Sequence, residues 1–134
     1  MVAPPPEDPP EGYFTGSPNE VLNHVLECID TGEHDRAELI IAQLISNFSA
    51  NAEAWNLRGI NSLKGGNPEL AIRCFAEASK LDLSSAVYAS NLGNALGVDN
   101  RWEEAAGAWS RAVLLAPSVS AYQLGLATSL LHID

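Results

Sequence analysis

Small residues recur along this chain at a fixed period of 34 residues, and this period constrains the fold more than any other feature. In three successive copies an alanine is followed, four positions later, by a large apolar residue. The pairs are Ala37 with Ile41, Ala71 with Phe75, and Ala105 with Trp109. A small side chain beside a large one at the same place in each copy indicates a repeated contact between crossing helices.

A second register position also stays small, as expected where another helix approaches closely. Gly59 and Gly93 occupy it in the middle copies, Val25 in the earlier copy and Ala127 in the later one. The period divides the chain into full copies at 18–51, 52–85 and 86–119, and a partial copy at 120–134.

Each copy contains two segments with apolar residues at three- and four-residue steps, which is the periodicity of an amphipathic helix. The first helix of each copy is predicted at Asn19–Asp30, Glu53–Lys64 and Val87–Val98. No segment alternates apolar and polar residues over the length of a strand, so the pattern favours an all-α fold of antiparallel helix pairs.

Polar residues between the segments predict where helices begin and end. Capping signals are expected at Ser17-Pro18-Asn19-Glu20, at Asn67-Pro68, and at Asn100 with Glu103. Turns within the helix pairs are expected at Thr31-Gly32, Gly65-Gly66 and Asp99-Asn100.

The central copy resembles the tetratricopeptide repeat, whose signature reads W-x2-L-G-x2-Y, then A-x3-F, then P. Trp55, Gly59, Ala71 and Phe75 match it, and the next copy adds Leu92, Trp109 in the Phe slot and Pro117; the departures in the central copy are at Arg58, Ser62 and Leu83. The resemblance implies a right-handed superhelical solenoid of antiparallel helix pairs, with three repeats plus a C-terminal single helix. In that family the first helix of each pair lines a concave groove.

Charge limits the kind of partner. The 134 residues include seven Lys and Arg against seventeen Asp and Glu, which gives a net charge of −10. This balance disfavours nucleic acid and anionic membranes and favours a neutral or basic protein or peptide. No apolar run is long enough to span a membrane and no secretory signal is evident, so we expect a cytoplasmic protein.

The first seventeen residues differ in composition from the rest. Residues 1–17 are rich in proline and acidic residues, which favours an extended, solvated leader over a ligand for an aromatic groove. Tyr13 and Phe14 are candidates to pack on the first helix. The domain itself is expected at residues 18–134.

Catalytic, cofactor and metal sites are not indicated. Cys28 and Cys74 are expected to be buried thiols. The three histidines, His24, His34 and His132, show no cysteine or carboxylate companions at ligand spacing. The prediction is therefore a noncatalytic protein-binding scaffold without a cofactor.

The resemblance and helical geometry together select candidate groove residues on the first helices: Leu22, Asn23, Leu26, Ile29, Asn56, Ile60, Leu63, Lys64, Ser90, Asn91, Asn94 and Gly97. Asparagine amides suit the backbone of an extended peptide, and the apolar members suit an amphipathic helix. Relatives that clamp a chaperone carboxylate use several Lys or Arg on successive first helices. Only Arg58 and Lys64 are present there, so such a clamp is not expected.

The last helix is apolar on nearly every side, whereas a terminal helix should be polar outside. Leu124, Leu131 and Ile133 are therefore expected to contact a following helix of a longer protein or a second copy of the chain. Two alternatives to the scaffold remain: a substrate-recruiting arm of a larger enzyme such as a glycosyltransferase, and a small acidic chaperone.

Overall fold

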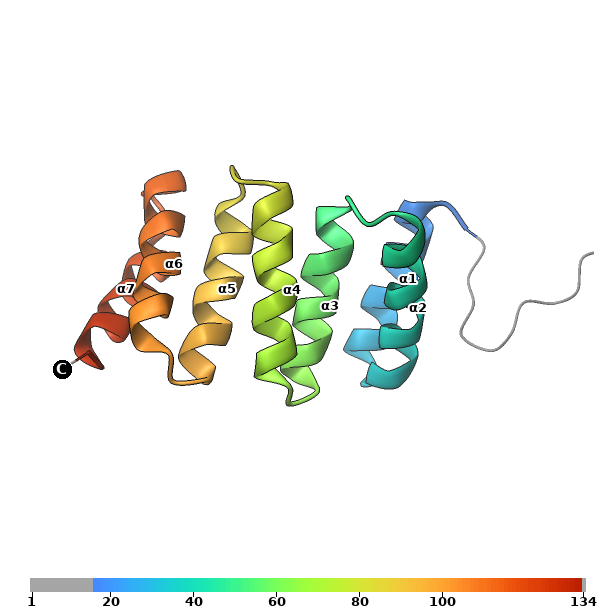
Figure 1. Ribbon diagram of the computed structural model, residues 1–134, viewed down its shortest axis with the longest axis horizontal. Helices are drawn as coiled ribbons and strands as arrows, with labels where there is room; N and C mark the ends of the chain where they lie inside the picture. Colours follow the sequence, from blue (N-terminus) through green and yellow to red (C-terminus); the bar gives the residue numbers. More distant parts are fainter. Residues whose placement is uncertain (1–15, 134) are drawn as a thin grey trace, which may run out of the picture.

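A computed structural model describes residues 16–133, and this part of the chain forms α-helices and no strand (Figure 1). The helices are α1 (Pro18–Asp30), α2 (His34–Asn47), α3 (Ala52–Lys64), α4 (Pro68–Leu81), α5 (Ala86–Val98), α6 (Trp102–Leu115) and α7 (Ser120–Leu131). The all-α prediction is confirmed, and the first helix of each copy begins one residue earlier than predicted. The expected leader, with Tyr13 and Phe14, lies almost wholly outside the described residues.

Two of the predicted helix starts are confirmed. The Ser17 hydroxyl accepts a hydrogen bond from the Glu20 backbone N–H at 3.4 Å, and the Glu20 carboxylate accepts one from the Ser17 N–H at 3.2 Å. The Asn67 side chain accepts from the Leu70 N–H at 3.2 Å. Both arrangements satisfy backbone donors that the first turn of a helix leaves without partners.

The predicted cap at Asn100 with Glu103 is wrong. α6 has Arg101 at its N-cap without a side-chain cap, and the Arg101 guanidinium donates instead to both carboxylate oxygens of Glu104, at 2.8 and 3.0 Å. Asn100 has φ +59°, in the left-handed region that Gly32 and Gly66 occupy in the two earlier turns. Asparagine tolerates this conformation better than most residues. Asn100 therefore forms part of the turn before α6 and does not cap the helix.

The helix pairs follow one another along a single axis (Figure 1). Each first helix contacts the first helix of the next copy: α1 touches α3, α3 touches α5 and α5 touches α7. The second helices α2, α4 and α6 do not contact one another. The first helices therefore form the inner side of the array and the second helices its outer side.

The alanine predicted at the helix crossing is completely buried in each full copy, at Ala37, Ala71 and Ala105. This burial agrees with a close helix crossing at these positions. In the middle copies a glycine faces an aromatic ring. A Cβ atom at Gly59 would lie 2.5 Å from Phe75 Cε1, and one at Gly93 would lie 2.9 Å from Trp109 ring atoms. The aromatic rings therefore occupy the space that a side chain at either glycine would need.

Val25 and Ala127, which occupy the same register position as Gly59 and Gly93, differ from each other in burial. Val25 is fully buried, whereas Ala127 is exposed because no second helix follows α7 among the described residues. The close approach at this end instead involves Gly125, which meets the ring of Trp109.

The apolar interior consists of two clusters. The first joins α1, α2 and the start of α3, and the second joins α4, α5 and α6. Ile60 packs against both. The interior is thus continuous through α3, as stacked repeats require.

Candidate functional site

The inner face formed by α1, α3, α5 and α7 carries most of the candidate residues. Asn23, Leu26, Lys64 and Asn94 are exposed on it. Four others are half-buried between these helices: Ile60, Leu63, Asn91 and Gly97. Eight of the twelve candidates thus have surface that a partner can reach.

The remaining four candidates are buried, contrary to expectation. Leu22 and Ile29 belong to the first apolar cluster. Asn56 is buried because its side-chain oxygen accepts a hydrogen bond from the Asn91 amide at 2.8 Å, which links α3 to α5. Ser90 is buried and its hydroxyl donates to the Val87 carbonyl at 2.8 Å. Packing of successive first helices thus uses Leu22, Ile29 and Asn56.

Positive charge on the inner helices is scarce. Arg58 belongs to an ion pair with Glu38 of α2, with its Nη2 2.6 Å from Glu38 Oε1. The hydrogen bond that Arg58 donates to Glu38 raises the pKa of Arg58, and the guanidinium lies 6.0 Å from the centre of the Trp55 ring. Lys64 is the cation that remains exposed on the first helices in residues 16–133.

A hydrogen bond also links two of the inner helices, α3 and α5. The Tyr88 hydroxyl of α5 donates to the Glu53 carboxylate of α3 at 2.8 Å. Burial and this bond raise the pKa of Tyr88, so the phenol stays protonated at neutral pH. Together with the Asn56–Asn91 pair, this contact holds the second and third copies at a fixed spacing.

A hollow of about 430 Å³ opens between α5, α6 and α7, and sequence reasoning missed it. Trp102 and Trp109 line it together with Gly93, Gly97 and Gly125. The His132 ring stacks on Trp102, with 3.9 Å between the ring centres. The available sequence signal was the set of glycines that fall within helices, together with the two tryptophans. A helix position without a side chain leaves space next to a large ring.

The face of α7 is exposed as the sequence suggested. Leu124 is 69% exposed and Leu131 86% exposed, and Leu130 adds to the same region. Ile133 is half-buried. Large aliphatic side chains at this level of exposure form an apolar surface at the end of the described array.

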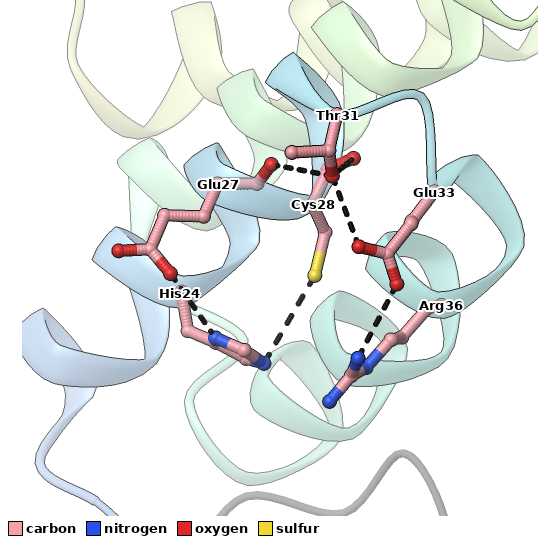
Figure 2. Close-up of polar contacts among 6 residues, drawn as sticks. All are labelled: His24, Glu27, Cys28, Thr31, Glu33 and Arg36. Carbon is pink, nitrogen blue, oxygen red and sulfur yellow. Dashed lines mark hydrogen bonds and ion pairs between the residues drawn. The ribbon is translucent and has the colours of Figure 1, made fainter.

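Polar side chains contact one another along α1 and at its turn to α2 (Figure 2). His24 Nε2 lies 4.0 Å from Cys28 Sγ, and His24 Nδ1 lies 3.6 Å from Glu27 Oε2. The prediction that His24 lacks cysteine and carboxylate companions is therefore wrong, since helical spacing of three and four residues places all three side chains on one face.

This cluster does not form an activated nucleophile. Cys28 is 2% exposed, and burial raises the pKa of its thiol, so it stays protonated at neutral pH. On the other side of the turn, the Thr31 hydroxyl and the Arg36 guanidinium contact the Glu33 carboxylate at 3.0 and 3.2 Å and lower the pKa of Glu33. The contacts of Thr31, Glu33 and Arg36 stabilise the turn between the first two helices (Figure 2).

Within residues 16–133 no three His, Cys, Asp or Glu side chains gather as metal ligands. Cys28 and Cys74 are free, buried thiols, as predicted. None of the helices described is both long enough and apolar enough to cross a membrane.

The second tetratricopeptide repeat domain of human RPAP3, solved with the HSP70 peptide SGPTIEEVD, superposes with a TM-score of 0.77. It is 21% identical to this chain, and the match covers 85% of this chain and 98% of that domain. The chain has the tetratricopeptide repeat fold. No family model and no curated protein matches the sequence.

Two other solved structures show what this tetratricopeptide array is similar to. The O-GlcNAc transferase of Thermobaculum terrenum is 26% identical over 87% of this chain, with a TM-score of 0.75, but the match spans only 23% of that protein. The Yersinia enterocolitica secretion chaperone SycD, solved with a peptide of the translocator YopD, is 13% identical. Its TM-score is 0.78, with 84% of this chain and 92% of that chain covered.

Proposed function

We propose that this tetratricopeptide array is a noncatalytic scaffold that binds a peptide or helix of a partner protein along its inner face. The main support is the uninterrupted contact of α1, α3, α5 and α7, which makes one surface from four helices. Asn23 and Asn94 offer amide donors and acceptors on that surface, and Leu26 offers apolar area. RPAP3 and SycD, both solved with peptides, support the same use of the fold.

The partner segment is neutral or basic. The chain has a net charge of −10, and Lys64 is the exposed cation of the inner helices that the structure describes. An acidic peptide such as the one bound to RPAP3 would meet too few donors here, because Glu38 already occupies Arg58. Basic flanking residues would instead be attracted by the acidic field. The two free thiols are consistent with a cytoplasmic location.

The test is selection from a displayed library of random peptides, followed by affinity measurements with matched variants. Leu26→Glu places a charge on the inner face, and Leu39→Glu makes the same change on α2; the two leucines are 41% and 46% exposed. We expect Leu26→Glu to weaken the selected peptides about tenfold and Leu39→Glu to leave their affinity unchanged. Equal effects of the two variants would contradict binding on the inner face.

A second candidate function is a substrate-recruiting arm of a larger enzyme. The 26% identity to part of the O-GlcNAc transferase and the exposed asparagines of the inner face favour it. A reading frame that continues past Asp134 into a catalytic domain would support this function over an independent scaffold. A frame that ends there would reject it.

We also propose that the exposed leucines of α7 pair with a second copy of the chain. Light scattering over a dilution series tests this with Leu131→Glu beside Leu114→Glu on α6, because these leucines are 86% and 83% exposed. We expect a dimer that Leu131→Glu dissociates and Leu114→Glu does not. A monomer at every concentration would reject the pairing.

A further inference from the structure

The hollow between α5, α6 and α7 differs chemically from the rest of this acidic protein. No residue that lines it carries an ionisable side chain. A hollow of similar volume between α3 and α4 is lined by Arg58, Arg73, Glu77 and Lys80. An anionic group would lose hydration in the first hollow without meeting a cation, whereas an apolar group would lose nothing.

The hollow exists because the third copy lacks a side chain that the earlier copies have. Gly97 stands in register with Ile29 of the first copy, which is buried, and Leu63 of the second, which is half-buried. A Cβ atom at Gly97 would lie 3.2 Å from Cζ3 of Trp102. A leucine at this position would extend into the hollow, so the glycine keeps it open.

The hollow also lies on the inner face. Asn94 and Val98 of α5 stand at one edge, and Leu124 and Thr128 of α7 stand at the other. Asn94 is exposed, so its amide is available to a peptide backbone that passes over the opening. Its volume of about 430 Å³ is near the lower end for ligand pockets, which span roughly 300–1,000 Å³.

We propose that this hollow is an anchor pocket that takes one large apolar side chain of the partner segment. The inference rests on the proposed function and names the chemistry of its ligand. The side chain contacts the rings of Trp102 and Trp109, while Asn94 holds the adjoining peptide group. The segment thus combines one apolar anchor with neutral or basic neighbours, in keeping with the neutral hollow and the acidic chain.

The test uses small probes, so it does not require the natural partner. The indole N–H signals of the three tryptophans are followed by NMR during titration with N-acetyl-leucinamide, N-acetyl-phenylalaninamide and, as the charged comparison, N-acetyl-aspartamide. We expect the first two probes to shift Trp102 and Trp109 at millimolar concentration and to leave Trp55 in place, because Trp55 lines the other hollow. We expect no shift with the aspartate probe.

Two glycine variants test whether the probes bind in this hollow. Gly97→Leu fills the hollow and should abolish the shifts, whereas Gly107→Leu on α6 should preserve them, because a Cβ atom at Gly107 meets nothing within 4 Å. Thr128→Asp puts a carboxylate at the exposed edge without filling the hollow. It should weaken the apolar probes about tenfold, and this result is independent of whether Gly97→Leu folds.

Several outcomes would overturn the anchor pocket. These are equal shifts of all three tryptophans, shifts that survive in a folded Gly97→Leu protein, no shift with either apolar probe, and Trp102 and Trp109 signals that still move on dilution of the Leu131→Glu protein, in which the pairing through α7 is disrupted. The last result would assign the hollow to a second copy. Selected peptides that bind while Trp102 and Trp109 stay unchanged would reject the pocket and retain the proposed function.

Discussion

The first helix pair and the two that follow reach the same arrangement with different side chains. In the first copy Val25 and Ile41, both fully buried, stand at the register positions of the crossing. In the second, Gly59 faces Phe75, and in the third, Gly93 faces Trp109. The volume lost from one helix is supplied by the ring of the other.

This difference explains why the first copy matches the repeat signature poorly and still folds as a repeat. The alanine of each crossing is common to all copies and completely buried. The glycine and the aromatic ring change together, so their contact matters more than either identity. A consequence for function is that aromatic rings, and the hollow beside them, lie in the later copies.

Introducing the valine of the first copy at the glycine of the second copy should have the largest effect on stability. In Gly59→Val the new side chain would overlap the Phe75 ring, because a Cβ atom alone would lie 2.5 Å from it. We expect a loss of about 3 kcal/mol in the free energy of unfolding, measured in urea. The double variant Gly59→Val/Phe75→Ile rebuilds the Val25–Ile41 pair and should recover about half of the loss; no recovery would mean that the pairs are not equivalent.

The crossing alanines of the first and second copies should be equally sensitive to a larger side chain, although their neighbouring residues differ. Ala37 and Ala71 are both completely buried. Ala37→Leu and Ala71→Leu should each reduce the free energy of unfolding by about 2 kcal/mol through overpacking. Unchanged thermal stability of Ala71→Leu would show that the register of the repeats is wrong.

Helix caps allow a smaller comparison between the end of the array and its middle. Ser17→Ala removes the capping box of α1, and Asn67→Ala removes the cap of α4. Each should cost about 1 kcal/mol in the free energy of unfolding. If urea unfolding responds to Asn67→Ala alone, the first helix pair opens separately from the rest.

The smallest effect concerns a buried thiol and appears with pH. Burial raises the pKa of Cys74 from 9.0 to about 11. Below pH 9 the thiol is protonated in the folded and unfolded chains alike; as pH rises from about 9 to 11 the unfolded chain loses the proton first, so stability falls. At pH 9.5 the loss should be about 0.8 kcal/mol relative to neutral pH. Cys74→Ala should lack this component, and an identical pH dependence in both proteins would contradict a buried thiol.

Local sequence patterns predicted the features that depend on neighbouring residues. The period, the first helix of each copy to within one residue, the capping box at Ser17 and the buried thiols all follow from short-range spacing and side-chain type. The cap predicted at Asn100 is wrong because asparagine suits both a cap and a left-handed turn, and only the path of the chain into α6 selects the turn.

The accessibility of side chains on the inner face could not be predicted from the sequence. Position on a helix identified the first-helix residues directed away from the partner within each pair, but Leu22, Ile29, Asn56 and Ser90 are buried. For Leu22, Ile29 and Asn56 the burial involves contacts between successive copies. Asn56, for example, meets Asn91 of the next copy, 35 residues away.

The sequence by itself determined that this protein is an array of helix pairs with small residues at its crossings, because helix periodicity and repeat register are local properties. Only the tertiary structure decided which inner side chains remain accessible and where a hollow lies. Both depend on how α5, α6 and α7 pack around Trp102 and Trp109, and packed volume is a property of several helices together, not of any one segment.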